Sequence, residues 1–460
     1  MLVAARDRNL DLAISSLPAR ADARFVASPC PPGVIAVLLA ILIAAGAGWG
    51  ARVWARRLAD HSVRAVAGRD VRFKYQTLTL QRAALASGDI LPIYGSSELR
   101  CCGSPFLPTE LFATMPTGFG ALALGHAGTA NLFFMQTFAA LGDGLRGKKV
   151  AISESPSWFR KPRGLSHREY AGNFSAEVAY AFVFDAPISR ELREAGARRM
   201  LAYPETLEDQ PLLRLAVGDL AHPTPLRRVE YALLTPLGRM AMSVLDVRDA
   251  LRTILVARGK RAAEPDTPPR AIDWPRLAER ATRKAEEADT TNAFGFPDAT
   301  YREMARRPEF RDPIERGQAG QSNRDGGLLP APVRWESDMS RSTEWKSLHL
   351  ALRVLRELDA RPLVWSLPMP GTFDDYTRLS EAQRRRYYAR YERIAGRADV
   401  PWLDFADHDE DRWFLSDPGS HPSPRGWVFA DRALDLFWHD RSADEIRTAL
   451  AALDREAPPP

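Results

Sequence analysis

The chain has 460 residues, of which 45% are hydrophobic and 26% charged, which excludes both a wholly disordered chain and a polytopic membrane protein. Its net charge is only +5, and no stripe of basic residues with interleaved aromatics occurs, so nucleic-acid binding is not expected. Three cysteines cannot form a disulfide framework or a four-ligand zinc site, and the length allows one large domain with insertions or two domains.

An apolar run follows an N-terminal tail of residues 1–33. No charged residue occurs between Arg24 and Arg52, and residues 34–50 together with the preceding Pro-Pro-Gly reach about the 20 residues that a membrane span needs. Because the run begins only after 33 residues, we interpret it as an uncleaved transmembrane anchor and not as a signal peptide. A buried core helix is the alternative.

The residues that flank the apolar run fit a membrane interface. Trp49 and Trp54 suit the level of the lipid headgroups, and three arginines follow at once. Counted literally, the positive-inside rule mildly favours the cytoplasm for the C-terminal side. Long domains translocate largely regardless of such charges, so we set this rule aside and base the orientation on the resemblance described below.

After a helix-rich connector over residues 51–87, segments typical of strands alternate with segments typical of helices. This alternation predicts an α/β fold with a parallel sheet that is covered on both faces. The expected strands are Ile90–Tyr94, Lys149–Ser153 and Pro362–Leu367, with a further strand-like run at Trp402–Phe405. The expected helices are Asn131–Leu145, Ser189–Met200, Leu226–Arg258 and Ser342–Leu358.

Three segments depart from this alternation. Residues 205–300 have few strand signals and are interpreted as a helical insertion within one domain over residues 88–440. Residues 311–341 are rich in glycine, proline and charge, which is typical of a long surface segment or lid. Residues 441–460 are expected to form a C-terminal tail that is disordered after Arg455.

The first candidate site motif is Gly95-Ser96-Ser97-Glu98, directly after the strand Ile90–Tyr94. In an open parallel sheet, ligands bind beyond the carboxyl ends of the strands, and a glycine there permits a tight turn. A serine on that turn is suited to act as a nucleophile, since nearby backbone N–H groups stabilise an oxyanion. The alternative is that one of the serines only caps a helix, with Glu98 in its first turn.

The second motif is Asp417 to His421, in a loop rich in proline and glycine before a helix that begins near Trp427. An aspartate beside a histidine orients the imidazole, which then deprotonates a serine. His421 is the only one of the eight histidines in this context. His408, which lies among acidic residues, is the rival, and a plain surface histidine is the alternative for His421.

A third piece is the glycine-containing loop from Gly125 to Asn131, which precedes a helix. Its backbone amides are candidates for an oxyanion hole. Phosphate binding is not supported, because the loop lacks the Gly-Lys-Ser/Thr ending of a P-loop. His126 is either a substrate contact or a structural histidine, and no metal-ligand pattern occurs in the sequence.

Six short motifs occur in order over roughly residues 88–440, behind the apolar run. They are Tyr94-Gly-Ser-Ser-Glu98, Gly125 to Gly128-Thr129, Ser155-Pro156-Ser157-Trp158-Phe159, Asn173-Phe174-Ser175, Asn292-Ala-Phe-Gly295, and Asp417 to His421 with Gly426-Trp427. Together they closely resemble the DltD family, the single-span D-alanyl transfer proteins of teichoic-acid D-alanylation. The resemblance implies an SGNH-hydrolase-like three-layer α/β sandwich outside the cytoplasmic membrane.

The resemblance also assigns site residues. It implies Ser97 as the nucleophile with Ser96 as the fallback, His421 as the base and Asp417 as the acid that orients it. Gly128 and the Ser97 amide become the candidate oxyanion donors. Two departures from the family pattern stand out: three residues instead of two separate Asp417 from His421, and Ser157 replaces a glutamine that is a candidate oxyanion or substrate contact.

The function that the resemblance implies is a membrane-anchored extracytoplasmic serine acyltransferase. Such an enzyme transfers D-alanyl or a similar acyl group to an envelope polymer or glycolipid, in partnership with a membrane-bound O-acyltransferase and a D-alanyl carrier protein. No cofactor or metal is expected. The alternatives are an esterase or thioesterase with the same three residues, and a non-catalytic scaffold. The arginine-rich composition differs from that of low-GC Gram-positive members, so an acceptor other than teichoic acid is left open.

Overall fold

A computed structural model describes residues 32–67, 73–100, 104–259, 269–287, 339–376, 379–417, 419 and 421–459. The chain divides into two compact units, residues 1–47 and residues 48–460, and the fold described below belongs to the second. The 292–295 motif, the three cysteines and all but the last three residues of the predicted lid lie outside the described residues.

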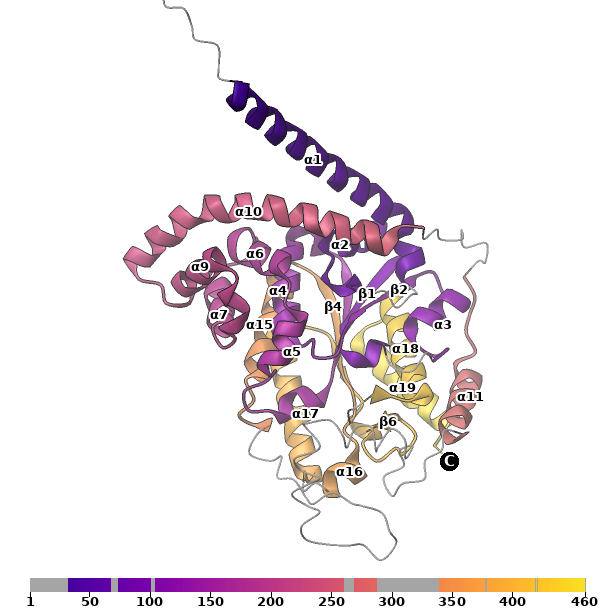
Figure 1. Cartoon of the computed structure of the whole chain (residues 1–460). Coiled ribbons are helices and arrows are strands. Elements are labelled where there is room, and N and C mark those ends of the chain that lie inside the picture. The colour runs from indigo at the N-terminus through magenta and orange to yellow at the C-terminus, as the bar shows by residue number, and fades with distance from the viewer. Residues whose placement is uncertain are drawn as a thin grey trace, which may run out of the picture. The chain divides into compact units, whose positions relative to one another are not determined.

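A five-stranded parallel sheet forms the centre of the second unit, in the strand order β2-β1-β3-β4-β5 (Figure 1). The strands are β1 (Ile90–Gly95), β2 (Gly120–Gly125), β3 (Lys149–Glu154), β4 (Arg361–Ser366) and β5 (Trp402–Asp404). The predicted strands at 90, 149, 362 and 402 are therefore confirmed, and the α/β class with them. The strand β2 was not predicted.

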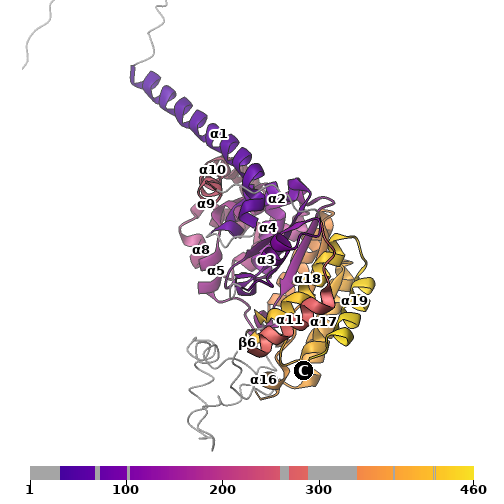
Figure 2. The same cartoon turned by 90° about the vertical axis from the view of Figure 1, so that its right-hand side faces the viewer.

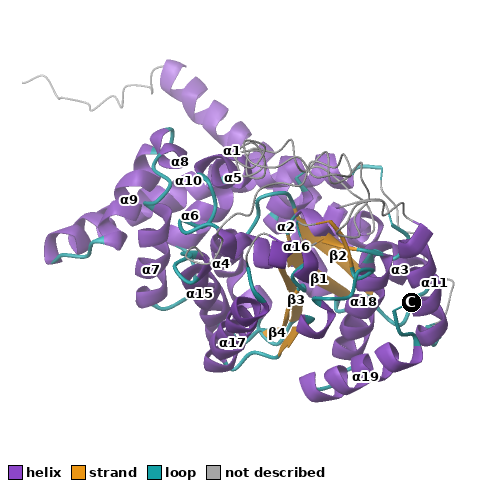
Figure 3. Cartoon of the chain, turned by 90° about the horizontal axis from the view of Figure 1, so that it is seen from below, coloured by secondary structure: helices purple, strands orange, loops and turns teal. Residues whose placement is uncertain are grey.

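Alternate side chains of each strand enter two different cores. In β1, Ile90 and Tyr94 belong to one hydrophobic cluster, and Leu91 and Ile93 belong to the other. Since successive residues of a strand point to opposite faces, both faces of the sheet are buried, as a continuous apolar strand requires. Figure 3 shows the strands between two groups of helices, so the architecture has three layers.

The first helical layer packs against the face of the sheet that carries Tyr94. It contains α2 (Leu78–Ser87), α4 (Asn131–Leu141), α6 (Ala176–Phe184), α7 (Arg190–Met200), α9 (Pro211–Ala221), α15 (Glu344–Glu357) and α17 (Glu381–Ala398). The long helix α10 (Pro225–Ala257) covers α6 and α9 from outside. Shorter helices in this part are α5 (His167–Asn173) and α8 (Glu205–Glu208), whereas Phe373 of the short helix α16 (Gly371–Tyr376) belongs to the second core.

The second helical layer, which Figure 2 brings to the front, packs against the opposite face of the sheet. It contains α3 (Pro108–Thr114), α11 (Trp274–Glu287), α18 (Pro424–Trp438) and α19 (Ala443–Glu456). Two short antiparallel strands, β6 (Leu415–Asp417) and β7 (His421–Pro422), precede α18. Short 3₁₀ turns are η1 (Lys74–Gln76), η2 (Ser97–Arg100), η3 (Gly142–Leu145), η4 (Pro156–Arg160) and η5 (Ala406–His408).

The region from 205 to 300 is helical where it is described, as expected, but its helices do not form one block. The helices α8, α9 and α10 lie with the first layer, whereas α11 packs against α18 in the second. The apolar side chains of α11, such as Leu277 and Ala281, bury against the core of the second layer. The segment therefore contributes helices to both faces of the sheet.

The expectation of a C-terminal tail over 441–460 is wrong. Residues 443–456 form α19, which Ser442 caps and which buries Ile446, Leu450 and Leu453 in the core of the second layer. The sequence carries the usual signature of such a helix, a serine followed three residues later by Glu445 in a capping box. The tail was therefore predicted one helix too early.

The N-terminal helix α1 runs from Pro32 to Ala67. Among the described residues, Val34–Ala67 is the helix that is long and apolar enough to cross a membrane, by length and composition. Apolar side chains in its first half, such as Ile41 and Ile43, are exposed, whereas Val63 and Val66 near its end are buried in the first core. The expected helix-rich connector is therefore the second half of α1 followed by η1 and α2.

Candidate active site

Ser97 lies where the chain direction across the sheet reverses. From β1 the chain adds β2 on one side of the sheet and β3 on the other, so the carboxyl end of β1 is a topological switch point, where open α/β sheets bind their ligands. Residues 97–100 form the 3₁₀ turn η2 directly after β1. Ser97 is half-buried, so its hydroxyl lies at the accessible edge of the sheet.

The structure brings Ser97, His421 and Asp417 into one line of hydrogen bonds. The Ser97 Oγ lies 2.8 Å from Nε2 of His421, although 324 positions separate the two residues in the chain. On the other side of the ring, Nδ1 lies 2.5 Å from Oδ2 of Asp417. His421 and Asp417 are both buried. A hydroxyl, an imidazole and a carboxylate in this order form the arrangement that activates a serine nucleophile.

The short strands β6 and β7 position the histidine and the aspartate. Asp417 pairs with His421 across the two strands, and its Oδ1 accepts a hydrogen bond from the Gly419 amide at 2.7 Å. Ser423 then caps α18, with Pro424 at the first helical position, so the loop leads directly into a core helix. Asp417 and His421 thus pair directly across a small hairpin, although three positions separate them in the chain.

The neighbouring hydroxyl of Ser96 has a different environment. Ser96 is buried, donates a hydrogen bond to the carbonyl oxygen of His126 at 3.1 Å and accepts one from the Gly128 amide at 3.2 Å. Thr129 adds a second link between the two loops, because its hydroxyl lies within hydrogen-bond distance of the carbonyl oxygens of Gly95 and His126. The Ser96 hydroxyl therefore joins the loop after β1 to the loop after β2.

Glycines make this close approach of the two loops possible. Gly95 and Gly125 are neighbours in the register of β1 and β2. A Cβ atom on Gly125 would lie 2.5 Å from the carbonyl oxygen of Ser96, and one on Gly95 would lie 2.4 Å from Oε1 of Glu98. Gly128 has φ near +83°, a conformation that favours glycine. Its amide lies beside the Ser97 turn, as an oxyanion donor needs, but in this structure it donates to Ser96.

Ser157 is close to the histidine loop but does not contact the Ser97 hydroxyl. It follows β3 in η4, and its Oγ lies 2.7 Å from Oγ of Ser155. Ser155 in turn reaches the carbonyl oxygen of Gly419 at 3.5 Å. The half-buried Ser157 is therefore connected to Gly419, which lies between Asp417 and His421 in the chain, through Ser155.

Two buried carboxyl groups, those of Glu98 and Glu154, lie near Ser97, and the sequence motifs did not predict their burial. Oε1 of Glu98 accepts a hydrogen bond from the Ser96 amide at 2.8 Å, and burial raises the pKa of Glu98, while that hydrogen bond and the charge of His421 act in the opposite direction. Burial also raises the pKa of Glu154 well above its usual value, despite a hydrogen bond from Asn131. The signal available in the sequence was only their position, directly after β1 and at the end of β3.

The other histidines that the sequence raised lie elsewhere. His408 stacks on the ring of Phe414 and pairs with Asp411 at 3.5 Å, so it belongs to the packing under the hairpin. His126 stacks on Tyr75, with ring centroids 5.2 Å apart. Within the described residues, no group of three or more His, Cys, Asp or Glu side chains is arranged to hold a metal ion.

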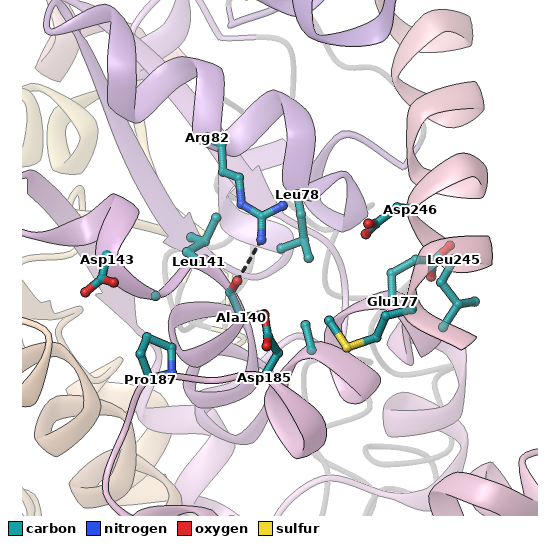
Figure 4. A pocket seen from close by; sticks show the side chains of 13 residues that line it. Leu78, Arg82, Ala140, Leu141, Asp143, Glu177, Asp185, Pro187, Leu245 and Asp246 are labelled. Atoms are coloured by element: carbon teal, nitrogen blue, oxygen red, sulfur yellow. Dashed lines mark hydrogen bonds between the residues drawn. The ribbon is translucent and has the colours of Figure 1, made fainter. Parts of the chain in front are cut away.

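Two cavities help to define the surroundings. A cavity of about 620 Å³ borders the hairpin, lined by Pro422 and Trp427 together with Phe106, Arg280 and Lys284. A second cavity, of about 250 Å³, lies between α2, α4, α6 and α10 and is shown in Figure 4. Its lining includes Arg82, which donates to the carbonyl oxygen of Ala140 at 2.9 Å, but none of the candidate site residues. The first cavity is lined by Ser416 and Pro422, the chain neighbours of Asp417 and His421, but by none of the candidate site residues themselves.

Comparison with known proteins identifies the family. Residues 72–439 match the family described as DltD protein. The chain is 27% identical to Protein DltD of Bacillus subtilis over 365 residues, which cover 79% of this chain and 86% of that protein. It is 22% identical to Protein DltD of Staphylococcus aureus over 357 residues, which cover 77% and 82% of the two chains. The chain therefore belongs to the DltD family, which takes part in the D-alanylation of teichoic acids.

Proposed function

We propose that this protein is a membrane-anchored serine acyltransferase that transfers D-alanyl or a similar acyl group to an envelope polymer or glycolipid. The observation that carries the proposal is the pair of hydrogen bonds at His421, to Ser97 on one side and to Asp417 on the other. Membership of the DltD family supports the acyl group and the type of acceptor. Ser97 is the proposed nucleophile, because Ser96 is occupied in joining the two loops.

In the first half of the reaction, the Ser97 Oγ attacks the carbonyl carbon of the acyl donor, and its proton moves to Nε2 of His421. The bond from that carbonyl carbon to the oxygen or sulfur of the donor breaks, and the leaving group takes the proton from Nε2. Asp417 stabilises the charged imidazole and holds it in the required tautomer. The product is an acyl ester of Ser97.

In the second half, a hydroxyl of the acceptor attacks the ester carbonyl and gives its proton to Nε2, and the Ser97 Oγ regains that proton as it leaves. The Ser97 and Gly128 amides are the proposed donors to the oxyanion that forms in both halves. For Gly128 this requires its N–H to turn from the Ser96 hydroxyl to the substrate. Ser157, beside the hairpin, is a proposed substrate contact.

The proposed location is the outer face of the cytoplasmic membrane, with α1 as the single span. Its length and apolar composition support the anchor. The proposed partners are a membrane-bound O-acyltransferase and the D-alanyl carrier protein of the pathway, with an envelope glycan or glycolipid as acceptor. Arg280 and Lys284 line the cavity beside the hairpin, and their charges suit an anionic acceptor polymer or carrier.

The test compares two adjacent serines. In cells that depend on this protein, Ser97→Ala should abolish D-alanine ester in the envelope while the protein stays in the membrane. In Ser96→Ala, an acylated peptide containing Ser97 should still form, at a reduced rate. Intact esterification in Ser97→Ala would exclude acyl chemistry at this residue and leave a scaffold role. An acyl label on Ser96 in the wild-type protein would transfer the nucleophile assignment to that residue.

A second experiment separates transfer from hydrolysis, since an esterase or thioesterase would use the same three residues. The purified protein receives a D-alanyl thioester with and without a glycan acceptor. A transferase should release D-alanine slowly without the acceptor and form acceptor ester when it is added. Rapid release of free D-alanine that does not depend on the acceptor would favour the hydrolase.

A further inference from the structure

The outer surface of α10 carries a continuous apolar stripe. Eight large apolar side chains on this helix are between 52% and 77% exposed. They are Leu226, Val229, Leu233, Leu237, Met240, Val244, Leu251 and Leu255. Contiguous exposed apolar surface of this extent marks a site of contact with a protein or a membrane. The question is which of these two surfaces covers the stripe.

The stripe is narrow and straight. At 3.6 residues per turn, the eight positions fall within an arc of about 80° and extend over about 44 Å of the helix. The opposite face of α10 is occupied, because Gly238 packs against Phe184 of α6 and Asp249 receives hydrogen bonds from the start of α2. Met242 and Leu245 of α10 also line the cavity in Figure 4. The stripe therefore faces away from the core.

Arginines flank the stripe on both sides. Arg228 and Arg239 lie beyond one edge of the stripe, and Arg239 pairs with Asp185. Arg248 and Arg252 lie on the other side, and both pair with Glu177 of α6. A helix with an apolar face and arginines along its polar edges is typical of helices that lie in the plane of a membrane interface, where the guanidinium groups reach the lipid phosphates. Since three of these four guanidinium groups are paired within the fold, the choice between a lipid surface and a protein partner rests on the position of the stripe beside α1.

Contacts with α1 place α10 next to the end of the apolar span. Arg52, the first charge after the apolar run, donates to the carbonyl oxygen of Ser243 at 2.8 Å and lies 3.8 Å from Asp246. One turn further on, Ala55 packs against Ala250 and Ile254. If the preceding residues cross the bilayer, these contacts hold α10 at the level where the span leaves it.

We propose that α10 lies in the headgroup region of the membrane, with its apolar stripe inserted among the acyl chains. This inference rests on the membrane anchor of the proposed function. The apolar stripe of α10 and the exposed Trp49 and Trp54 of α1 would then lie in the same interfacial region of the membrane. Two elements, a span and an interfacial helix, then hold the catalytic domain on the membrane.

The experiment uses the full chain in lipid nanodiscs that contain no other protein. A fluorescent label is attached to single cysteines, in a background in which the three native cysteines are replaced by serine. The stripe positions are Leu233→Cys and Val244→Cys, the flank control is Arg228→Cys, and the anchor control is Val37→Cys. Lipids with a nitroxide on the acyl chain should quench both stripe labels about two-fold, and the flank label much less.

Each other outcome has a distinct meaning. Quenching at Val37 without quenching at the stripe overturns the inference but leaves the anchor intact. If Val37 also escapes quenching, the anchor fails and the inference fails with it. Stripe labels that are shielded both from the lipid nitroxide and from aqueous iodide would show that a second copy of the chain covers α10, which also overturns the inference.

A second variant tests the apolar character of the stripe. The double substitution Leu233→Gln and Val244→Gln changes two exposed side chains, so the fold should be unaffected. It should lower the quenching of a label at Met240→Cys toward that of the flank control. Unchanged quenching in this variant would mean that α10 does not insert through its apolar stripe.

Discussion

Asp417 and His421 face each other across two short antiparallel strands, and a 2.5 Å hydrogen bond joins Oδ2 of the aspartate to Nδ1 of the histidine. Paired residues of neighbouring strands carry their side chains on the same face, so the hairpin itself sets this contact. The Gly419 amide binds the other carboxylate oxygen and fixes the plane of the carboxylate. Nε2 is thereby directed at Ser97.

Asp417→Asn tests whether this contact matters for chemistry. The amide keeps the size of the side chain but favours the wrong tautomer of His421, so the rate of acyl-serine formation should fall by about 10³–10⁴-fold. The rate is measured by rapid quench with a D-alanyl thioester. Ser416→Ala is the matched control, because Ser416 lies on the same strand as Asp417 and its hydroxyl donates to the His421 carbonyl oxygen. Its rate of acyl-serine formation should fall far less. A small effect of Asp417→Asn would mean that another acid orients His421.

The candidate site residues could be located in the sequence because each lies in a loop with a local signature, and the resemblance to the DltD family then implied their roles. Ser97 follows an apolar strand and a glycine, and His421 follows an aspartate within a Pro/Gly loop. The hydrogen bond between them depends on which strands are neighbours, and that order is set by the packing of the whole sheet. The hydrogen bonds that join Ser96 to the loop of Gly128 also depend on strand order. The local sequence pattern alone does not distinguish Ser96 from Ser97.

The sequence analysis did not predict strand β2 and helix α19, for different physical reasons. The strand β2 reads Gly-Ala-Leu-Ala-Leu-Gly, and its glycine and alanine have low β-propensity, so its pairing with β1 overrides local preference. Helix α19 carries a clear capping box, but residues 441–460 were interpreted as a tail beyond the domain, so its apolar face was not assigned to the core. The division of α8–α11 between two layers depends on tertiary contacts alone.

Gly125→Ala tests the close approach of the two site loops. The added methyl group would lie 2.5 Å from the Ser96 carbonyl oxygen, which is backbone and cannot move aside without shifting the loop after β1. We expect the free energy of unfolding to fall by about 1–3 kcal/mol, as for other overpacked positions. Chemical denaturation of the purified protein measures this change.

The control for this substitution lies on the same strand. Gly120 begins β2, and a Cβ atom there meets no heavy atom within 4 Å. Gly120→Ala should therefore leave the free energy of unfolding within about a few tenths of a kcal/mol of the wild type or raise it. Equal effects of the two substitutions would show that strand propensity, and not contact with Ser96, governs Gly125.

Removal of residues 441–460 tests whether α19 is part of the core of the second layer. Truncation exposes the core surface that Ile446, Leu450 and Leu453 cover, at a cost of about 1.5–3 kcal/mol for each side chain. It also removes Asp454, which lies 2.7 Å from the fully buried Arg425. We expect little soluble protein from this truncation. Removal of residues 458–460 should leave the yield and the melting temperature unchanged, and equal yields from both truncations would contradict the role of α19.

Glu344→Gln tests a buried carboxyl group at the start of α15. Burial raises the pKa of Glu344 to about 7, although Arg199, 3.9 Å away, lowers it. Between the usual value of 4.5 and about 7, the folded state therefore holds a proton that the unfolded chain has lost, and the free energy of unfolding falls as the pH rises through this window. The glutamine variant should match the wild type near pH 4 and exceed its stability above pH 8 by up to about 3 kcal/mol. Urea denaturation across this range measures the difference. Arg199→Gln should extend the fall in stability to higher pH, because the folded-state pKa of Glu344 then rises further. A difference between Glu344→Gln and the wild type that stays constant with pH would show that Glu344 keeps its ordinary pKa.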